Sequence, residues 1–284
     1  MSLVTSSELL AKAEAGGYAV GAFNCNNMEL IQAIISAAEA ERSPVIIQAS
    51  QGAIKYAGLG YITALVREAA LSSDVPVALH LDHGTDFEQV MKCLRAGFTS
   101  VMFDGSHFSL EENIKKTAQV AEIAHAVGVS VEGELGRLQG TEDQISVSER
   151  EAFFTDPQEA LTFVKETGID ALAPSIGTAH GRYQGRPKLD FQRLKEIHEL
   201  VPIPLVLHGS SGVPAEDIRS AIALGVRKVN IDTDIRQAFV QEVRQVLAAD
   251  VDEIDPRKVL GPARAKATEV IREKIRLFGS NDKA

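Results

Sequence analysis

Three histidines are the residues of this chain whose surroundings point most directly to chemistry. His83, His180 and His208 are each followed by glycine, in the motifs HLDHG, GTAHG and LHGSSG, and each comes at or just after an apolar run. Imidazole is the commonest metal ligand, and a catalytic zinc keeps three protein ligands and one open position. We therefore predict one metal site at these three residues, with His107 as the alternative to one of them.

Carboxylates end the same apolar runs. Asp82 directly precedes His83, and Asp104 and Glu134 end two later runs. A polar side chain inside a barrel strand is costly unless it is paired or functional. Because side chains alternate along a strand, Asp82 shares a face with His80 and opposes His83. We expect the strand to bulge or end there so that Asp82 and His83 reach one site, and His80 to pack lower in the barrel.

Two turns rich in small and hydroxyl residues predict a phosphate site. They read HGSSG, with Ser211, and NIDTD, with Thr233. Barrels of alternating strands and helices often bind phosphate with the loops after strands seven and eight, near a helix N-terminus. Small residues let backbone N–H groups approach the phosphate oxygens.

Short apolar runs alternate with segments of helical period along the whole chain. We predict strands at residues 18–25, 45–50, 75–82, 100–105, 129–136, 171–177, 205–208 and 227–231, and helices at 28–41, 62–72, 87–96, 110–127, 157–167, 191–200, 215–224, 235–248 and 262–278. Nearly apolar strands covered by helices are typical of a parallel sheet. The pattern predicts a single-domain (β/α)8 TIM barrel over residues 1–284 with an extra C-terminal helix, because no GxGxxG follows the first strand as an open sheet would favour.

A long polar segment interrupts this rhythm at about residues 137–155, after the fifth strand. The connections in such folds are usually much shorter. A loop at this end of a barrel lies at the active-site face, so we interpret the segment as a lid, with an insertion that has no role as the alternative.

Composition excludes several classes of partner. The net charge is −10, which argues against nucleic acid, and no apolar run approaches the roughly 20 residues of a membrane span. Cys25 and Cys93 lack CxxC spacing and are expected to be reduced and partly buried. No basic, then apolar, leader follows Met1, so we expect a cytoplasmic protein.

Taken together, the ordered motifs resemble the class II, metal-dependent fructose-bisphosphate aldolases over essentially the whole chain. The matching stretches are GAFNCNN, QAS (residues 48–50), HLDHG, FDGS, VEGELG, GTAHG, PLVLHGSSG, NIDTD and DPRKVLGPAR. The resemblance implies reversible cleavage of fructose 1,6-bisphosphate to dihydroxyacetone phosphate and glyceraldehyde 3-phosphate, a reaction of glycolysis and gluconeogenesis.

The resemblance also implies roles for the residues above. Zn²⁺, or another divalent ion such as Co²⁺, at His83, His180 and His208 would polarise the ketone and stabilise the enediolate. Asp82 would move the proton of the C4 hydroxyl, and Glu142 in the loop would protonate the enediolate.

Further site residues are implied in the same way. Asp104 and Glu134 would hold a second metal, and a monovalent cation (Na⁺ or K⁺) would lie near the ketose phosphate. Arg257 would be lent by a neighbouring subunit to the other phosphate, which implies a homodimer or homotetramer. The remaining substrate contacts would be Asn24, Ser50, Gly181, Gly209, Ser210, Ser211, Asn230, Ile231, Asp232 and Thr233.

Two positions bear on the substrate. Tagatose-bisphosphate aldolases typically carry alanine where this chain has Asp232, and a carboxylate there favours the fructose epimer. Many relatives carry lysine where this chain has Gln184, so the phosphate would depend more on N–H donors and Arg257, with Arg182 or Arg186 as substitutes.

Two other functions remain as alternatives. A metallohydrolase on the same barrel would usually carry an HxH pair on its first strand, where this chain has Phe23-Asn24-Cys25. A sugar-phosphate sensor or scaffold would be expected to lose the acid/base carboxylates, yet Asp82 and Glu142 are both present.

Overall fold

Eight parallel strands close into a barrel in the computed structural model of the chain, which describes residues 3–137, 139–142, 145–147, 153–181 and 185–284. Around the barrel the order is β1-β11-β10-β8-β5-β4-β3-β2, so strands that follow one another in the sequence are neighbours. This confirms the predicted TIM barrel. The strands are β1 Val20–Asn24, β2 Val45–Ser50, β3 Val77–Gly84, β4 Ser100–Phe103, β5 Ser130–Leu135, β8 Ala171–Pro174, β10 Leu205–Leu207 and β11 Val226–Ile231.

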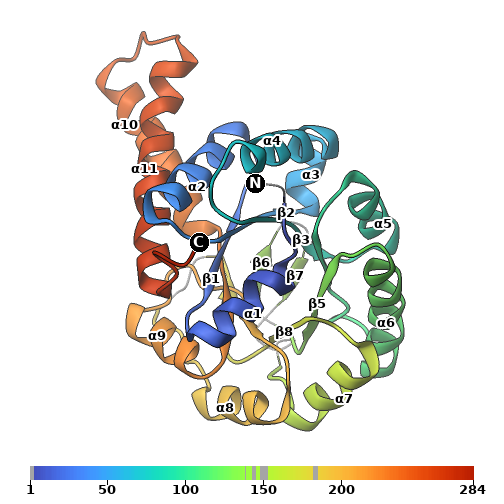
Figure 1. Cartoon of the computed structure of the whole chain (residues 1–284). Coiled ribbons are helices and arrows are strands. Elements are labelled where there is room, and N and C mark those ends of the chain that lie inside the picture. Colours follow the sequence, from blue (N-terminus) through green and yellow to red (C-terminus); the bar gives the residue numbers. More distant parts are fainter. Residues whose placement is uncertain (1–2, 138, 143–144, 148–152, 182–184) are drawn as a thin grey trace.

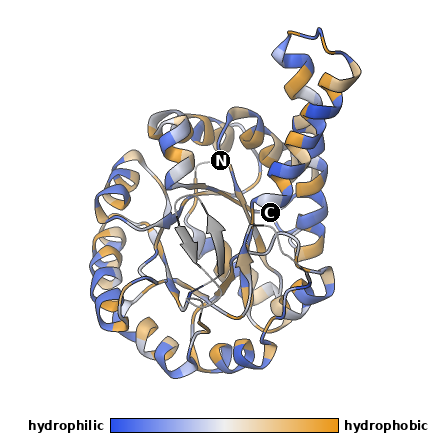
Figure 2. Cartoon of the chain, turned by 180° about the vertical axis from the view of Figure 1, so that it is seen from behind, coloured by the Kyte–Doolittle hydropathy of each residue, from blue (hydrophilic) through white to orange (hydrophobic). Residues whose placement is uncertain are grey.

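Helices surround the barrel as a ring (Figure 1). They are α2 Met28–Glu41, α4 Leu59–Leu71, α5 Phe87–Ala96, α6 Leu110–Ala126, α7 Pro157–Thr167, α8 Phe191–Leu200 and α9 Ala215–Ala223. Each has a buried apolar face toward the strands, and Figure 2 shows hydrophobic and hydrophilic residues alternating along these helices. A short helix, α3 Gln51–Ala57, was not predicted; Ser50 caps its N-terminus by accepting a hydrogen bond from the backbone N–H of Ala53 (3.3 Å).

A helix that the sequence analysis missed, α1 Ser6–Gly16, lies across the N-terminal end of the barrel (Figure 1). Its apolar residues Leu9 and Leu10 are buried in the same cluster as the inward-facing Val20 and Ile46. The Oγ atom of Ser6 lies 2.8 Å from those of Ser100 and Ser130 on two strands. Because this end of the barrel is closed by packing, the open end at the carboxyl ends of the strands is where a substrate can enter.

The last two helices, α10 Thr233–Ala249 and α11 Pro256–Phe278, extend together beyond the ring as an arm (Figure 1). The prediction that the last helix begins at residue 262 was wrong. Asp255 caps it by accepting a hydrogen bond from the N–H of Arg257 (2.9 Å), and Pro256 suits the first helical position, whereas Pro262 lies inside the helix. The helix therefore starts six residues earlier than the second proline suggested.

The segment after β5 contains two short strands, β6 Gln139–Glu142 and β7 Ile145–Val147, which pair antiparallel. β6 also pairs parallel with β9 Ala179–His180, so part of this segment is tied to the backbone of His180. Its predicted role as a lid, like the single-domain boundary at 1–284, stays a prediction.

Two further expectations from composition can be compared with the structure. Cys25 and Cys93 are free thiols and both are buried, and burial raises the pKa of the Cys25 thiol to about 12 and that of Cys93 to about 11. Among the described residues, none of the helices has the length and apolar character that crossing a membrane requires.

Candidate active site

The end of β3 delivers Asp82 and His83 to the same place. The pairing of β3 with β4 shifts register between Leu81 and Gly84, which is the predicted bulge. His83 adopts a φ of +45°, in the left-handed region that non-glycine residues rarely occupy. Such strain is held by surrounding structure and clusters at functional sites. The bulge places two successive side chains, both buried, at the open end of the barrel.

Three imidazoles meet there. The ring centroid of His83 lies 4.9 Å from that of His180 and 4.7 Å from that of His208, and one ring nitrogen from each of the three lies within 4.8 Å of the others. Gly209 permits this approach: its φ is +58°, and a Cβ there would lie 2.5 Å from the backbone oxygen of Ala179. The backbone conformation and the close contact therefore require glycine directly after His208.

A second group of ligand-type side chains shares His83. The Nδ1 atom of His83 lies 2.9 Å from Oδ2 of Asp104 and 3.6 Å from Oε2 of Glu134, and all three side chains are buried. Burial raises the pKa of the Asp104 carboxyl, but the hydrogen bonds with His83 and Ser106 and the charge of His83 together outweigh burial, so the pKa lies below its ordinary value. His107 belongs to neither group among the described residues; it is exposed and its ring packs on Phe108.

Below the imidazoles lies a buried ionic network whose role the sequence analysis did not identify. Oε1 of Glu132 lies 2.8 Å from Nε2 of His208, and its Oε2 lies 2.9 Å from Nζ of Lys228. His80 completes it, with Nε2 3.6 Å from Glu132 and Nδ1 2.7 Å from Oγ of Ser100. His80 therefore packs lower in the barrel, as expected from strand alternation.

The electrostatics of this network follow from its burial. Burial raises the pKa of the Glu132 carboxyl, yet the Lys228 ammonium and the hydrogen bond with His208 bring it below its ordinary value. Burial also lowers the pKa of His208, although the hydrogen bond to Glu132 opposes this, and it lowers that of His80 well below the ordinary 6.5. Neutral imidazoles beside an ionised carboxylate are the arrangement that a metal ligand needs.

Asp82 is held by three amide groups. Its Oδ2 accepts hydrogen bonds from Nδ2 of Asn24 (2.8 Å) and Nε2 of Gln48 (3.0 Å), and its Oδ1 accepts one from Nδ2 of Asn230 (3.2 Å). Gln48 also donates to Oδ1 of Asn24 (2.7 Å). These donors come from three strands and fix the carboxylate in one orientation beside His83.

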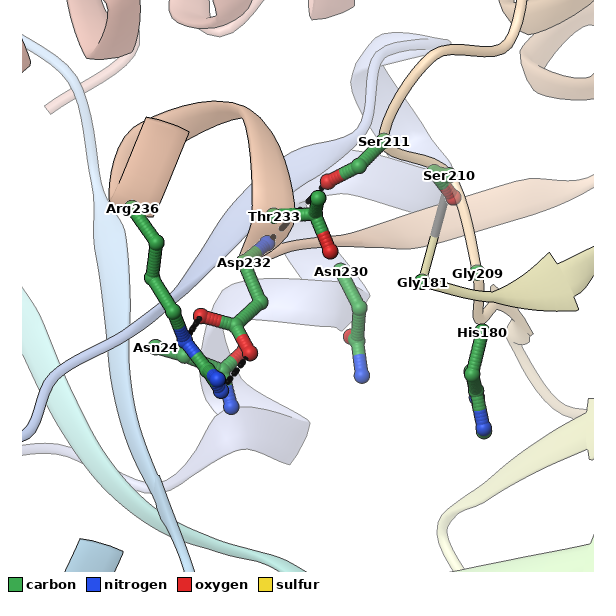
Figure 3. Close-up of a pocket in the computed structure, with 10 residues that line it drawn as sticks. All are labelled: Asn24, His180, Gly181, Gly209, Ser210, Ser211, Asn230, Asp232, Thr233 and Arg236. Carbon is green, nitrogen blue, oxygen red and sulfur yellow. Dashed lines mark hydrogen bonds and ion pairs between the residues drawn. The ribbon is translucent and has the colours of Figure 1, made fainter. Parts of the chain in front are cut away.

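A polar pocket opens next to the imidazoles, with about 490 Å³ of space that includes open solvent. Figure 3 shows the residues that line it, which are Asn24, His180, Gly181, Gly209, Ser210, Ser211, Asn230, Asp232, Thr233 and Arg236. Eight of the ten substrate contacts implied by the resemblance line this pocket, whereas Ile231 is buried in β11 and does not. Oγ of Ser211 accepts hydrogen bonds from the N–H groups of Asp232 and Asp234 (both 3.3 Å), so the two predicted phosphate turns meet.

Arg236 was not identified from the sequence. It lies one helical turn after Asp232 on α10, forms an ion pair with that carboxylate, and also lines a neighbouring pocket. That second pocket includes Ser50, the other implied contact, together with Asn26, Asn27, Gly52, Ala53 and Tyr56. The i, i+4 spacing of an acid and a base in the NIDTDIR stretch is the signal that could have found it.

The remaining implied residues lie elsewhere. Arg257 is at the end of the arm, where its side chain is 90% exposed and paired with Asp255. Arg186 pairs with Glu216 and Asp217 at the surface. Glu142 ends β6, but its side chain lies outside the described part of the structure, as do Arg182 and Gln184 altogether.

The sequence and the fold both resemble those of known proteins. The family model of class-II fructose-bisphosphate aldolases matches residues 4–283. The chain is 50% identical to the fructose-bisphosphate aldolase of Thermus caldophilus, covering 99% of this chain and all of that one, and 50% identical to that of Geobacillus stearothermophilus, covering 100% and 99%. It is also similar to the crystal structure of the YdjI aldolase from Escherichia coli K12, with a TM-score of 0.88, 35% identity and 99% of each chain covered. The chain therefore belongs to the class-II fructose-bisphosphate aldolase family.

Proposed function

We propose that the chain cleaves fructose 1,6-bisphosphate reversibly to dihydroxyacetone phosphate and glyceraldehyde 3-phosphate, with a divalent metal ion held by His83, His180 and His208. The observation that carries the proposal is the meeting of these three imidazoles beside Asp82, at the edge of a polar pocket. Membership of the family supports the reaction, and the donor set supports zinc or a similar ion such as Co²⁺.

The hydrogen-bond directions fit a cation at this place. Nδ1 of His83 and Nε2 of His208 each face a buried carboxylate, that of Asp104 and that of Glu132, which when ionised can only accept. The protons of both rings therefore lie on these outer nitrogens. Two lone pairs then face each other, at Nε2 of His83 and Nδ1 of His208, which are 3.0 Å apart. Such a contact between two acceptors is favourable only when a positive charge lies near both.

A divalent ion held there supplies a Lewis acid for the ketose carbonyl. The protein's own part in the reaction is proton transfer and positioning. Asp82, whose carboxylate is oriented by Asn24, Gln48 and Asn230, would take the proton of the C4 hydroxyl during cleavage and return it during condensation. Glu142 is proposed as the acid that protonates the enediolate left after cleavage, because the strand that carries it, β6, pairs with the strand of His180.

Recognition of two phosphates is supported by two adjoining pockets that share Arg236. Gly181, Gly209, Ser210 and Ser211 offer small side chains and N–H groups for the ketose phosphate, and a Na⁺ or K⁺ ion near them remains part of the proposal. The second phosphate would lie in the pocket of Ser50. A second divalent ion at Asp104 and Glu134 is proposed because a carboxylate oxygen of each lies within 4.8 Å of the other and of His83.

Arg257 supports a homodimer or homotetramer. It follows α10, whose 17 residues leave the pocket at Thr233 and rise by about 25 Å. An arginine that far from its own pocket cannot contact a substrate there, whereas an arm that projects from the barrel can reach a neighbouring subunit (Figure 1). Exposed apolar side chains at the arm, Val251 (81%) and Ile254 (92%), are also in keeping with burial against another chain.

The substrate test compares fructose and tagatose 1,6-bisphosphates with the zinc-loaded protein. We expect triose phosphates from both, with a higher kcat/KM for the fructose epimer, because Asp232 lines the pocket with a carboxylate that can accept a hydrogen bond from a sugar hydroxyl. A clear preference for tagatose would reverse the assignment of the epimer. Release of inorganic phosphate without triose phosphates would instead indicate a metallohydrolase.

A further inference from the structure

Glu132 bridges a proposed metal ligand and a buried lysine. One carboxylate oxygen contacts Nε2 of His208 (2.8 Å) and the other contacts Nζ of Lys228 (2.9 Å). Glu132 is 2% exposed and Lys228 is 0% exposed. Neither residue lines the two pockets described above, and neither belongs to the two ligand groups found among the described residues.

A buried ion pair of this kind is a poor way to gain stability. Removing two charges from water costs several kcal/mol per ion, and well-packed apolar residues often serve as well or better. Apolar residues fit beside both members of the pair, since Ala171 on β8 is the strand partner of Glu132, Val206 on β10 is that of Lys228, and both are buried. The presence of the pair therefore calls for a role besides packing.

The role is indicated by the direction of each hydrogen bond. An ionised carboxylate can only accept, so the proton of a neutral His208 lies on Nε2 and the lone pair on Nδ1. Nδ1 lies 3.0 Å from Nε2 of His83 and 3.7 Å from Oε2 of Glu134, which is too far for a hydrogen bond, so only the carboxylate of Glu132 accepts from this ring. The opposite tautomer would direct an N–H group toward the place where the cation is proposed to lie.

We infer that Glu132 is a positioning residue that fixes His208 in the tautomer and orientation able to bind the metal through Nδ1, and that Lys228 holds the carboxylate in this position. The inference rests on the proposed metal site. Partners of this kind behind a ligating histidine typically change metal affinity by 10- to 100-fold when they are replaced. Loss of the hydrogen bond between Glu132 and His208 does not remove a metal ligand, so we expect weaker metal binding and not its complete loss.

Glu132→Gln removes the charge with little change in shape, and we expect it to raise the dissociation constant for Zn²⁺ and Co²⁺ about 10- to 100-fold in competition with a chelator. The single variant leaves Lys228 without its counter-charge, so the double variant Glu132→Gln/Lys228→Met is measured beside it. We expect the double variant to recover thermal stability in the metal-free form but to bind metal as weakly as the single variant, with an altered visible absorption spectrum of bound Co²⁺.

The matched control is Ser100→Ala. This change removes two other buried hydrogen bonds of Oγ of Ser100, with Nδ1 of His80 (2.7 Å) and with Oγ of Ser6 (2.8 Å), but leaves the contact between Glu132 and His208 in place. We expect a lower melting temperature with metal affinity and Co²⁺ spectrum as in the wild type. A purely structural role for Glu132 would make its variants behave like this control, and that result would overturn the inference.

The wild-type protein supplies an independent measurement that no folding defect can obscure. Long-range ¹H–¹⁵N correlation of the histidine rings reports which nitrogen carries the proton. We expect the Nε2–H form for His208 in the metal-free and the zinc-loaded protein, and an Nδ1–H form would contradict the inference. A wild type that binds no divalent ion would refute the proposed function itself, whereas tight binding by both Glu132 variants would refute only this inference.

Discussion

Replacement of Asp82 by asparagine separates proton transfer from metal binding. The carboxylate accepts three hydrogen bonds, two at Oδ2 and one at Oδ1. A carboxamide keeps one acceptor oxygen, which is best placed on the side of Asn24 and Gln48. Its NH₂ group then faces Nδ2 of Asn230, donor against donor. One lost buried hydrogen bond costs about 1–3 kcal/mol of folding stability.

The expected effect on catalysis is larger than the effect on stability. Loss of a positioned base costs about 10²- to 10⁴-fold in rate, which corresponds to about 2.7–5.4 kcal/mol in the activation barrier. We expect kcat for Asp82→Asn to fall by this factor, with KM and bound metal little changed because Asp82 is outside the three-imidazole group. The assay couples triose phosphate release to NADH oxidation, and metal content is measured on the same sample.

The matched control is Asp86→Asn, the same chemical change four residues later. Asp86 caps α5 by accepting a hydrogen bond from the N–H of Glu88 (3.1 Å), and asparagine caps helices about as well. We expect unchanged kcat for this variant. If Asp82→Asn kept its rate within about threefold, or lost its metal, the assignment of Asp82 as the base would be refuted.

Three further predictions concern specificity, assembly and stability. Asp232→Ala should lower the ratio of kcat/KM for fructose over tagatose bisphosphate about tenfold or more, and an unchanged ratio would remove this carboxylate from epimer discrimination. Arg257→Ala and Asp82→Asn, each weakly active alone, should together form mixed oligomers with one complete site; a mixture no more active than the sum of its parts would mean that the arginine is not shared. The hydrogen bond from Arg276 holds the pKa of Glu41 below its ordinary 4.5, although burial opposes this. The ionised Glu41 therefore stabilises the fold above about pH 4.5, and this stabilisation is lost as the pH falls through the lower pKa that Glu41 has in the folded protein. Urea unfolding at pH 7 and pH 4 should therefore show a smaller loss of stability for Glu41→Gln than for the wild type, and parallel losses would contradict this.

The elements that carry a regular pattern were predictable from the sequence. The apolar runs before His83, His180 and His208 indicated the strands. Strand alternation placed His80 lower in the barrel and required the strand either to bulge or to end at Asp82, and the register shift shows that it bulges. The covering helices were predictable from their period. The fold was therefore recoverable because each of its units repeats one local pattern.

The parts that the sequence analysis missed depend on relations between distant segments. The stretch Thr5-Ser-Ser-Glu8 has the sequence pattern of a capping box, which could have revealed α1, but only the barrel explains why that helix is needed to close its lower end. Glu132 was visible as a charged residue in β5, yet its partner Lys228 lies 96 positions away, and the register of a closed barrel decides which interior residues share a layer. Arg236 became a site residue only when α10 was placed beside the pocket.

The central claim is that three imidazoles hold a divalent ion on which carbon–carbon cleavage depends. Its most direct test is cleavage of fructose 1,6-bisphosphate by protein stripped of metal with EDTA, before and after addition of Zn²⁺ or Co²⁺, for the wild type and for His180→Ala. The account predicts no cleavage by the stripped protein, recovery of the wild type at about one ion per site, and no comparable recovery of the variant. Full activity of the metal-free wild type, or trapping of a covalent substrate adduct by borohydride, would contradict it.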